Sequence, residues 1–91
     1  MAIVVEFNIP DMTAAEYDGV LRELERKGAG SPDGRLYHVA APNPGGWFVV
    51  EVWGSQQQFD RFGEVLIPTL EAAGVTPATP EVRPVHNIIT G

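Results

Sequence analysis

The chain has 91 residues, a formal net charge of −6 and a pI near 4.6, so we expect one domain over residues 1–91, with neither nucleic acid nor anionic lipid as a partner. A domain this small leaves much of its surface unburied, and a second copy of the chain would supply additional core. The sequence has no cysteine and two histidines, which excludes a disulfide scaffold and a thiolate metal site and leaves too few ligands for a dedicated zinc site.

Residues 2–8 predict a β-strand, which ends before Pro10 because the residue preceding a proline avoids α geometry. Ile3, Val5 and Phe7 share one wholly apolar face of this strand. No basic segment precedes the apolar run, and the run is too short to cross a bilayer. We therefore expect neither a signal peptide nor a membrane span, and a cytoplasmic location.

A first helix is predicted from Thr13 to Gly28. Thr13 and Glu16 have the spacing of a capping box, in which both side chains accept backbone N–H groups at the helix start. The positions with helical apolar spacing are Tyr17, Val20, Leu21 and Leu24. These four side chains are expected to form the buried face, and a polar connection follows as far as Gly34.

Residues 36–53 predict a β-hairpin. Two runs rich in β-branched and aromatic residues, LYHVAAP and WFVVEVW, flank the turn-forming cluster NPGG. The glycine pair is not expected to bind phosphate, because no lysine accompanies it and no helix follows it directly.

A second helix is predicted to begin at Ser55, where Gln58 completes another capping box, and to bury the face formed by Phe59, Phe62, Leu66 and Leu70. Pro68 interrupts this pattern at a cost of about 3 kcal/mol, which predicts a kink or two short helices in tandem. Gly74 is expected to end the helix in a Schellman motif.

A final strand is predicted over residues 81–89, after a linker rich in proline and threonine. Pro84 places this strand at a sheet edge or at a bulge, because proline donates no hydrogen bond to a neighbouring strand. The sequence does not decide whether Arg83 and Asn87 or Pro84 and His86 face inward.

The predicted order β, α, β, β, α, β with right-handed crossovers gives an α+β fold, a ferredoxin-like sandwich whose antiparallel sheet carries both helices on one face. Alternation assigns to the helix-covered face Ile3, Val5, Phe7, Tyr37, Val39, Phe48, Val50 and Val52. The opposite face receives Val4, Glu6, Asn8, Leu36, His38, Trp47, Val49, Glu51 and Trp53. Because a face with two tryptophans is too apolar to remain in water, we expect a homodimer whose sheets pack face to face about a twofold axis.

The segment Glu51-Val52-Trp53-Gly54-Ser55, followed by Phe59 and Phe62 on a helix, completes a pattern that resembles the dimeric α+β barrel superfamily. Within it, the chain is similar to the antibiotic-biosynthesis-monooxygenase-like group over nearly its whole length. The resemblance implies a dimeric barrel with one of several activities. These are cofactor-independent oxygenation of polyketide quinols, haem degradation, lactone isomerisation and polyketide cyclisation, and some members have no known activity.

The chain departs from these relatives at positions that carry their chemistry. It has Phe62 where many monooxygenase-like members place a histidine, and Ala72 near the position of the iron-binding histidine of the haem degraders. Phe7 stands where those haem degraders use an asparagine. Because helix two offers no side chain to hold iron, we expect no axially ligated haem and assign no cofactor.

His38 and His86 are the candidate bases, because histidine is the side chain that exchanges protons near neutral pH. His38 and Glu51 lie on neighbouring hairpin strands with side chains on one face, which allows a cross-strand pair of base and orienting carboxylate. The alternative is that both histidines are structural, half-buried and hydrogen-bonded. We prefer His38 as base, since His86 lies near a chain end.

Four aromatic side chains are candidates for substrate contact: Trp53, Tyr37, Trp47 and Phe62. The tryptophans would stack on a planar substrate or, alternatively, fill an interface core. Tyr37 would donate its hydroxyl into a pocket between helices and sheet, or point outward. No metal is assigned, because Glu6, Glu51 and Glu81 do not share one element.

Two functions remain open from the sequence. One is a small dimeric enzyme without cofactor that abstracts a proton from a planar aromatic or polyketide-like molecule, leading to oxygenation or cyclisation. The other is a dimeric module that binds a hydrophobic small molecule or serves assembly without catalysis. A cavity large enough for a ring system and lined by a histidine would favour the enzyme.

Overall fold

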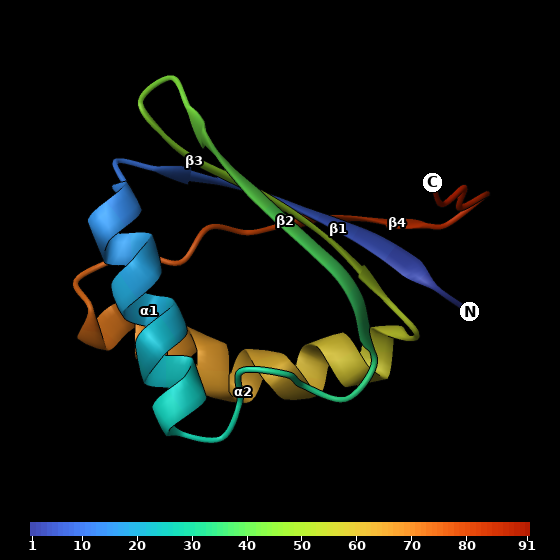
Figure 1. Cartoon of the computed structure of the whole chain (residues 1–91), viewed down its shortest axis with the longest axis horizontal. Coiled ribbons are helices and arrows are strands. Elements are labelled where there is room, and N and C mark those ends of the chain that lie inside the picture. The colour runs from blue at the N-terminus through green and yellow to red at the C-terminus, as the bar shows by residue number, and fades with distance from the viewer.

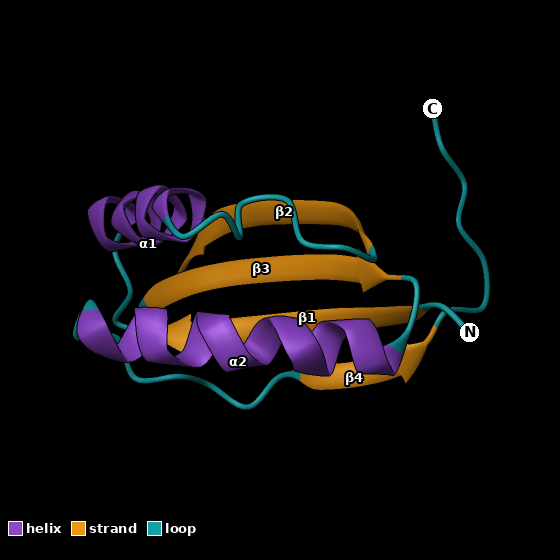
Figure 2. Cartoon of the chain, turned by 90° about the horizontal axis from the view of Figure 1, so that it is seen from below, coloured by secondary structure: helices purple, strands orange, loops and turns teal.

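All six predicted elements are present in the computed structural model, which describes residues 1–91. They are β1 (Ile3–Pro10), α1 (Ala14–Arg26), β2 (Arg35–Asn43), β3 (Gly46–Trp53), α2 (Gln56–Ala72) and β4 (Glu81–Pro84). The strands form one antiparallel sheet in the order β2-β3-β1-β4. Both helices lie on the same side of this sheet (Figure 1), α1 toward β2 and α2 toward β1 and β4 (Figure 2). The predicted ferredoxin-like α+β fold is confirmed.

The helix ends follow the predicted capping chemistry. Thr13 accepts the backbone N–H of Glu16 at 3.1 Å, and the Glu16 carboxylate accepts the backbone N–H of Thr13 at 2.9 Å. Ser55 caps α2 by accepting the backbone N–H of Gln58 at 3.2 Å. Gly74 takes a positive φ of 77°, which lets the N–H of the next residue reach the carbonyl of Leu70 at 3.0 Å, as in a Schellman motif.

Pro68 does not divide α2, which is one helix from Gln56 to Ala72. The expectation of two helices in tandem is therefore wrong. Pro68 and Glu64, whose carbonyl loses its helical partner, are both exposed, so water can satisfy that carbonyl. The next residue, Thr69, is buried and donates its hydroxyl to the carbonyl of Val65 at 2.7 Å.

The hairpin turn allows close packing of the chain against β1. Gly46 pairs with Pro10, and a Cβ added to Gly46 would lie 2.2 Å from the carbonyl oxygen of Ile9. Only glycine fits at this position without a backbone shift.

The last strand is shorter than predicted. β4 ends at Pro84 and lies at an edge of the sheet, as the proline indicated. Val82 and Pro84 pair with Val5 and Ile3, so they share the helix-covered side of the sheet, and Arg83 lies on the opposite side. His86 follows the strand and is exposed, so its predicted place within a strand is wrong.

The predicted faces of β2 and β3 are wrong by one residue, although those of β1 are right. Cross-strand partners share a face, and Val5 pairs with Glu51 while Phe7 pairs with Val49. The helix-covered face therefore receives Trp47, Val49, Glu51, Trp53 and His38. The open face receives Phe48, Val50, Val52, Tyr37 and Val39. Because WFVVEVW is apolar on both sides, composition could not decide which set was covered.

The core lies between the helices and this reassigned face. Ile3, Val5, Phe7 and Ile9 of β1 are all buried there. Trp53 is fully buried, with the rings of Phe59 and Phe62 at centroid distances of 5.7 and 5.4 Å. The tryptophans thus belong mainly to the intrachain core, which corrects the expectation that a second sheet covers them.

Neither helix has both the length and the apolar character required to span a bilayer.

Candidate active site

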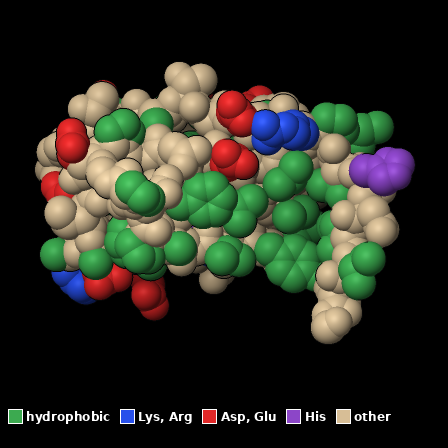
Figure 3. Space-filling view, turned by 90° about the horizontal axis from the view of Figure 1, so that it is seen from above, with side chains coloured by type: hydrophobic (Ala, Val, Ile, Leu, Met, Phe, Trp, Pro, Cys, Tyr) green, Lys and Arg blue, Asp and Glu red, His purple; other side chains and the backbone are tan.

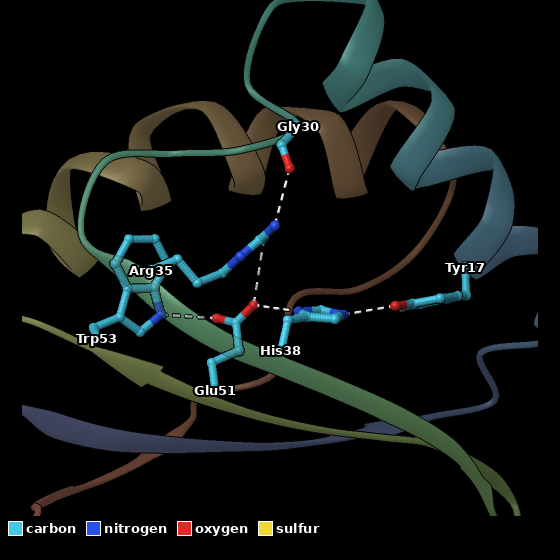
Figure 4. A network of polar contacts seen from close by, with 6 residues as sticks. All are labelled: Tyr17, Gly30, Arg35, His38, Glu51 and Trp53. Carbon is cyan, nitrogen blue, oxygen red and sulfur yellow. Dashed lines mark hydrogen bonds and ion pairs between the residues drawn. The ribbon is translucent and has the colours of Figure 1, made fainter. Parts of the chain in front are cut away.

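Glu51 is a buried carboxylate at the centre of β3, with 3% of its surface exposed. Burial of such a group is costly unless hydrogen-bond donors replace water. Oε1 accepts the indole N–H of Trp53 at 3.0 Å, and Oε2 accepts the Nδ1–H of His38 at 2.5 Å (Figure 4). The Arg35 guanidinium lies 3.8 Å from the same Oε2 atom. Glu51 is therefore the centre of a polar network in an apolar layer.

His38 projects from β2 directly opposite Glu51 in the strand register. Because the carboxylate accepts, Nδ1 carries the proton in the neutral ring and Nε2 has the free lone pair. The predicted pairing of His38 with Glu51 is confirmed, on the helix-covered face instead of the open one. The contact fixes both the ring orientation and the tautomer, which is the arrangement of a histidine base with an orienting carboxylate.

Tyr17 occupies the second ring nitrogen of His38. Its hydroxyl oxygen lies 2.6 Å from Nε2, and its ring packs on Trp47 at a centroid distance of 5.3 Å. Burial, and second the negative charge of Glu51, raise the pKa of the Tyr17 phenol above its ordinary value of 10.0. Tyr17 therefore stays protonated at neutral pH, and its hydroxyl donates a hydrogen bond to Nε2.

Arg35 at the start of β2 is the cation of the network. It donates to the carbonyl of Gly30 at 2.9 Å, and its guanidinium lies 6.0 Å from the centre of the Phe62 ring. At 3.8 Å it balances the charge of Glu51 without using a short hydrogen bond to it.

A cavity of about 50 Å³ lies between the helices and the sheet, beside this network. Its polar lining consists of Tyr17, Arg35, His38 and Glu51, and the rest is apolar and comes from both helices and from β1 and β3. A volume of this size admits a few water molecules, whereas pockets for drug-sized ligands measure about 300–1,000 Å³. Arg35 and His38 also line a polar cleft of about 250 Å³ on the outer side of β2. Water therefore reaches His38 from the sheet edge.

The predicted site residues divide into two groups. His38, Glu51 and Phe62 line the cavity, and Trp53 lies behind it, where its indole N–H holds Glu51. Trp47 packs against the ring of Tyr17, and its buried indole N–H has no acceptor. Tyr37 lines only the outer cleft, and His86 does not join the site.

Tyr37 is on the open face with 44% of its surface exposed, so the expectation that it points between helices and sheet is wrong. His86 is exposed beyond β4 and lines none of the cavities around the network. The structure thus brings only one of the two histidines to the cavity.

Sequence reasoning missed Tyr17 and Arg35 as members of the site. Tyr17 was assigned only to the buried stripe of the first helix, although a phenol on such a stripe needs a hydrogen-bond partner. Arg35 directly precedes the hairpin and had no sequence signal beyond its charge.

No protein-family model matches the sequence, and no curated protein matches it in sequence comparison. Solved structures do match in shape. The cofactor-independent oxygenase SnoaB from Streptomyces nogalater superposes with a TM-score of 0.62 at 16% identity, covering 99% of this chain and 96% of that protein. A provisionally designated antibiotic biosynthesis monooxygenase from Deinococcus radiodurans gives a TM-score of 0.63 at 16% identity, covering 99% and 97%. A similarly designated protein from Caulobacter crescentus gives 0.58 at 18% identity, covering 97% and 89%.

The chain shares the ferredoxin-like α+β fold of these proteins. Coverage of nearly the full length of each neighbour means that the likeness includes both helices and the whole sheet. Within this fold, the chain places its polar network in the layer between the helices and the sheet. Glu51 and Trp53, two of the residues that carry the resemblance seen in the sequence, meet there through a hydrogen bond.

Proposed function

We propose that this protein is a small enzyme that works without a cofactor and removes a proton from a planar aromatic or polyketide-like molecule. The observation that carries the proposal is the buried Glu51 carboxylate, which holds His38 with its Nε2 atom beside an apolar cavity. A buried charge that only filled space would be replaceable by an apolar residue, so its presence favours a chemical role. The likeness of the fold to a cofactor-independent oxygenase supports the same class of reaction.

In this mechanism Nε2 of His38 takes the proton, and the imidazolium that forms is stabilised by Glu51 at 2.5 Å. The substrate is left as an anion, and Arg35 is the cation that lines the cavity. Phe62 supplies an aromatic wall. In oxygenation the carbanion adds dioxygen to form a hydroperoxide, which loses water and leaves one new oxygen on that carbon. In cyclisation the carbanion attacks a carbonyl of the same molecule instead.

We further propose that the enzyme is a twofold homodimer joined through the open face of the sheet. Figure 3 shows hydrophobic side chains gathered across that side of the molecule. The large apolar and aromatic residues of the open face are Val4, Tyr37, Val39, Phe48, Val50 and Val52. The Arg83–Glu6 and Arg83–Glu81 ion pairs lie at its β4 side. Only 14 of 91 residues are buried within the single chain, so a second copy would supply the missing cover.

The test of the proton-removal step is turnover of naphthalene-1,4-diol, whose anion gives two electrons to dioxygen and forms the quinone and hydrogen peroxide. It is followed as dioxygen uptake and quinone formation above the uncatalysed rate. His38→Gln should keep the fold and lose turnover by about a hundredfold or more, as for a removed general base. Glu51→Gln should lose less and change the pH profile. His86→Gln is the matched control and should retain wild-type turnover. Full turnover in folded His38→Gln would refute the proposed base.

A non-catalytic assembly module is the second candidate, and the small volume of the cavity favours it. This alternative predicts neither saturable binding of aromatic molecules nor turnover of any diol probe by the wild-type protein. It also predicts that His38→Gln changes stability without affecting any reaction.

A further inference from the structure

Two features of the site oppose its proposed use, and both involve the same residue. The lone pair of His38 Nε2, which would accept the substrate proton, is occupied by the Tyr17 hydroxyl at 2.6 Å. The cavity beside His38, which is about 50 Å³ and lined in part by Tyr17, cannot hold a ring system. Displacement of Tyr17 would relieve both obstacles at once.

Tyr17 occupies the position beside His38 that an aromatic ligand with a hydroxyl group would take. It is a six-membered aromatic ring with a hydroxyl, half-buried, packed on Trp47 and donating to Nε2. Because Glu51 accepts from Nδ1, Nε2 of the neutral ring carries the lone pair, so the bond runs from the Tyr17 O–H to Nε2. Leu21, one turn further along α1, lines the same cavity and is 37% exposed, which places the outer wall at this helix.

We propose that Tyr17 is a gate residue, an internal ligand that holds His38 Nε2 and must leave before the base can act. The molecule that replaces it must offer its own O–H or N–H donor to Nε2, because the displaced hydrogen bond is otherwise lost. Cavity opening and exposure of the base are thereby coupled through one side chain. This inference rests on the proposed function only for the use of Nε2 as proton acceptor, since displacement itself is a binding event.

The gate lowers the apparent affinity of every incoming molecule, because the binding-competent state is only a fraction of the whole. Removing the Tyr17 hydroxyl while keeping its ring should therefore strengthen binding. A hydrogen bond of ordinary net strength corresponds to roughly threefold to tenfold in dissociation constant.

The experiment measures binding of 1-naphthol and of 1-methoxynaphthalene, which has no donor, to wild type and to Tyr17→Phe by calorimetry. We expect wild type to prefer 1-naphthol by roughly threefold to tenfold, because only 1-naphthol replaces the lost hydrogen bond. We expect Tyr17→Phe to bind both probes roughly threefold to tenfold more tightly. Tyr37→Phe, which removes an exposed phenol on the open face, is the matched control and should leave both constants unchanged.

The ¹⁵N signal of His38 Nε2 provides a second readout that does not depend on turnover. It should shift in Tyr17→Phe as the hydrogen bond disappears, and it should move back when 1-naphthol is added. The gate would be overturned if Tyr17→Phe bound 1-naphthol no more tightly than wild type, or showed no saturable binding of it. It would also be overturned if the Nε2 signal did not respond to 1-naphthol. If the gate behaves as expected while naphthalene-1,4-diol is not turned over, the proposed enzymatic function fails and the gate stands.

Discussion

Replacing Glu51 with glutamine tests the network most directly, because the side chain keeps its shape and loses its charge. Glu51 accepts from both Trp53 and His38, and an amide has a single oxygen, so one of the two donors then faces an NH₂ group. Hydrogen bonds to a charged group contribute about 1.5–3 kcal/mol, and an unpaired buried donor adds a further cost of similar size. We expect a loss of about 2–4 kcal/mol in the free energy of unfolding.

The assay is thermal and urea unfolding of the purified protein. For a chain of this length the entropy of unfolding makes 1 kcal/mol equivalent to about 5 °C, so the melting midpoint should fall by roughly 10–20 °C. Glu64→Gln, an exposed glutamate on α2, is the control and should change stability by no more than about 0.5 kcal/mol.

An apolar replacement of the whole network separates a functional role from a structural one. The triple variant Arg35→Met, His38→Phe, Glu51→Leu removes every charge at once and keeps similar volumes. Buried ion networks replaced in this way often yield equal or greater stability, by about 1–4 kcal/mol. Because the Trp53 N–H and the Tyr17 O–H lose their acceptors in it, we expect the triple variant to be less stable than wild type but more stable than Glu51→Gln. A triple variant as weak as Glu51→Gln, or a Glu51→Gln midpoint equal to wild type, would refute the reasoning.

Three further predictions concern other parts of the molecule. Gly46→Ala should lower the free energy of unfolding in urea by about 1–3 kcal/mol, because the added Cβ would meet the Ile9 carbonyl. Gly63→Ala, which has open space around it in α2, should raise that free energy by about 0.5–1 kcal/mol. Equal effects of the two substitutions would contradict the packing argument. The raised pKa of Tyr17 means that, at alkaline pH, the folded protein holds a proton that the unfolded chain releases. The contribution of Tyr17 to the free energy of unfolding is therefore complete below pH 10.0 and is lost as pH rises through the folded-state pKa. Tyr17→Phe should therefore lose less stability than wild type in alkaline melts, and superimposable pH curves would count against it. Val50→Lys at the centre of the open face should convert the proposed dimer to monomer in sedimentation at micromolar concentration, while Ile67→Lys on the exposed side of α2 should not.

The fold was predictable because its signals are local. The helix ends are marked by hydrogen bonds within a few residues of the chain. They involve the Thr13–Glu16 pair, Ser55 and the turn at Gly74. The hairpin was equally clear from its turn. The topology then followed from the order of elements and the handedness of crossovers.

The site was predictable only where pairing within the hairpin determines it. His38 and Glu51 oppose each other whichever face is covered, so their contact survived the error in the assigned faces. The face itself depends on the register between β1 and β3, which long-range packing sets. The Tyr17 contact depends in addition on where α1 rests on the sheet, and no spacing in the sequence encodes that position.

The alternation of β2 gives neighbouring residues separate tasks: His38 belongs to the proposed site, and Tyr37 and Val39 on either side belong to the proposed interface. A point substitution in this strand can therefore alter the proposed catalysis or the proposed assembly alone, and the two properties would then drift independently during evolution. An inserted or deleted codon within the strand has a different effect, because a shift of one residue exchanges the two faces from that point onward. Such a lesion would carry the histidine into the interface and an interface side chain into the cavity, so the protein would lose both properties in a single genetic event.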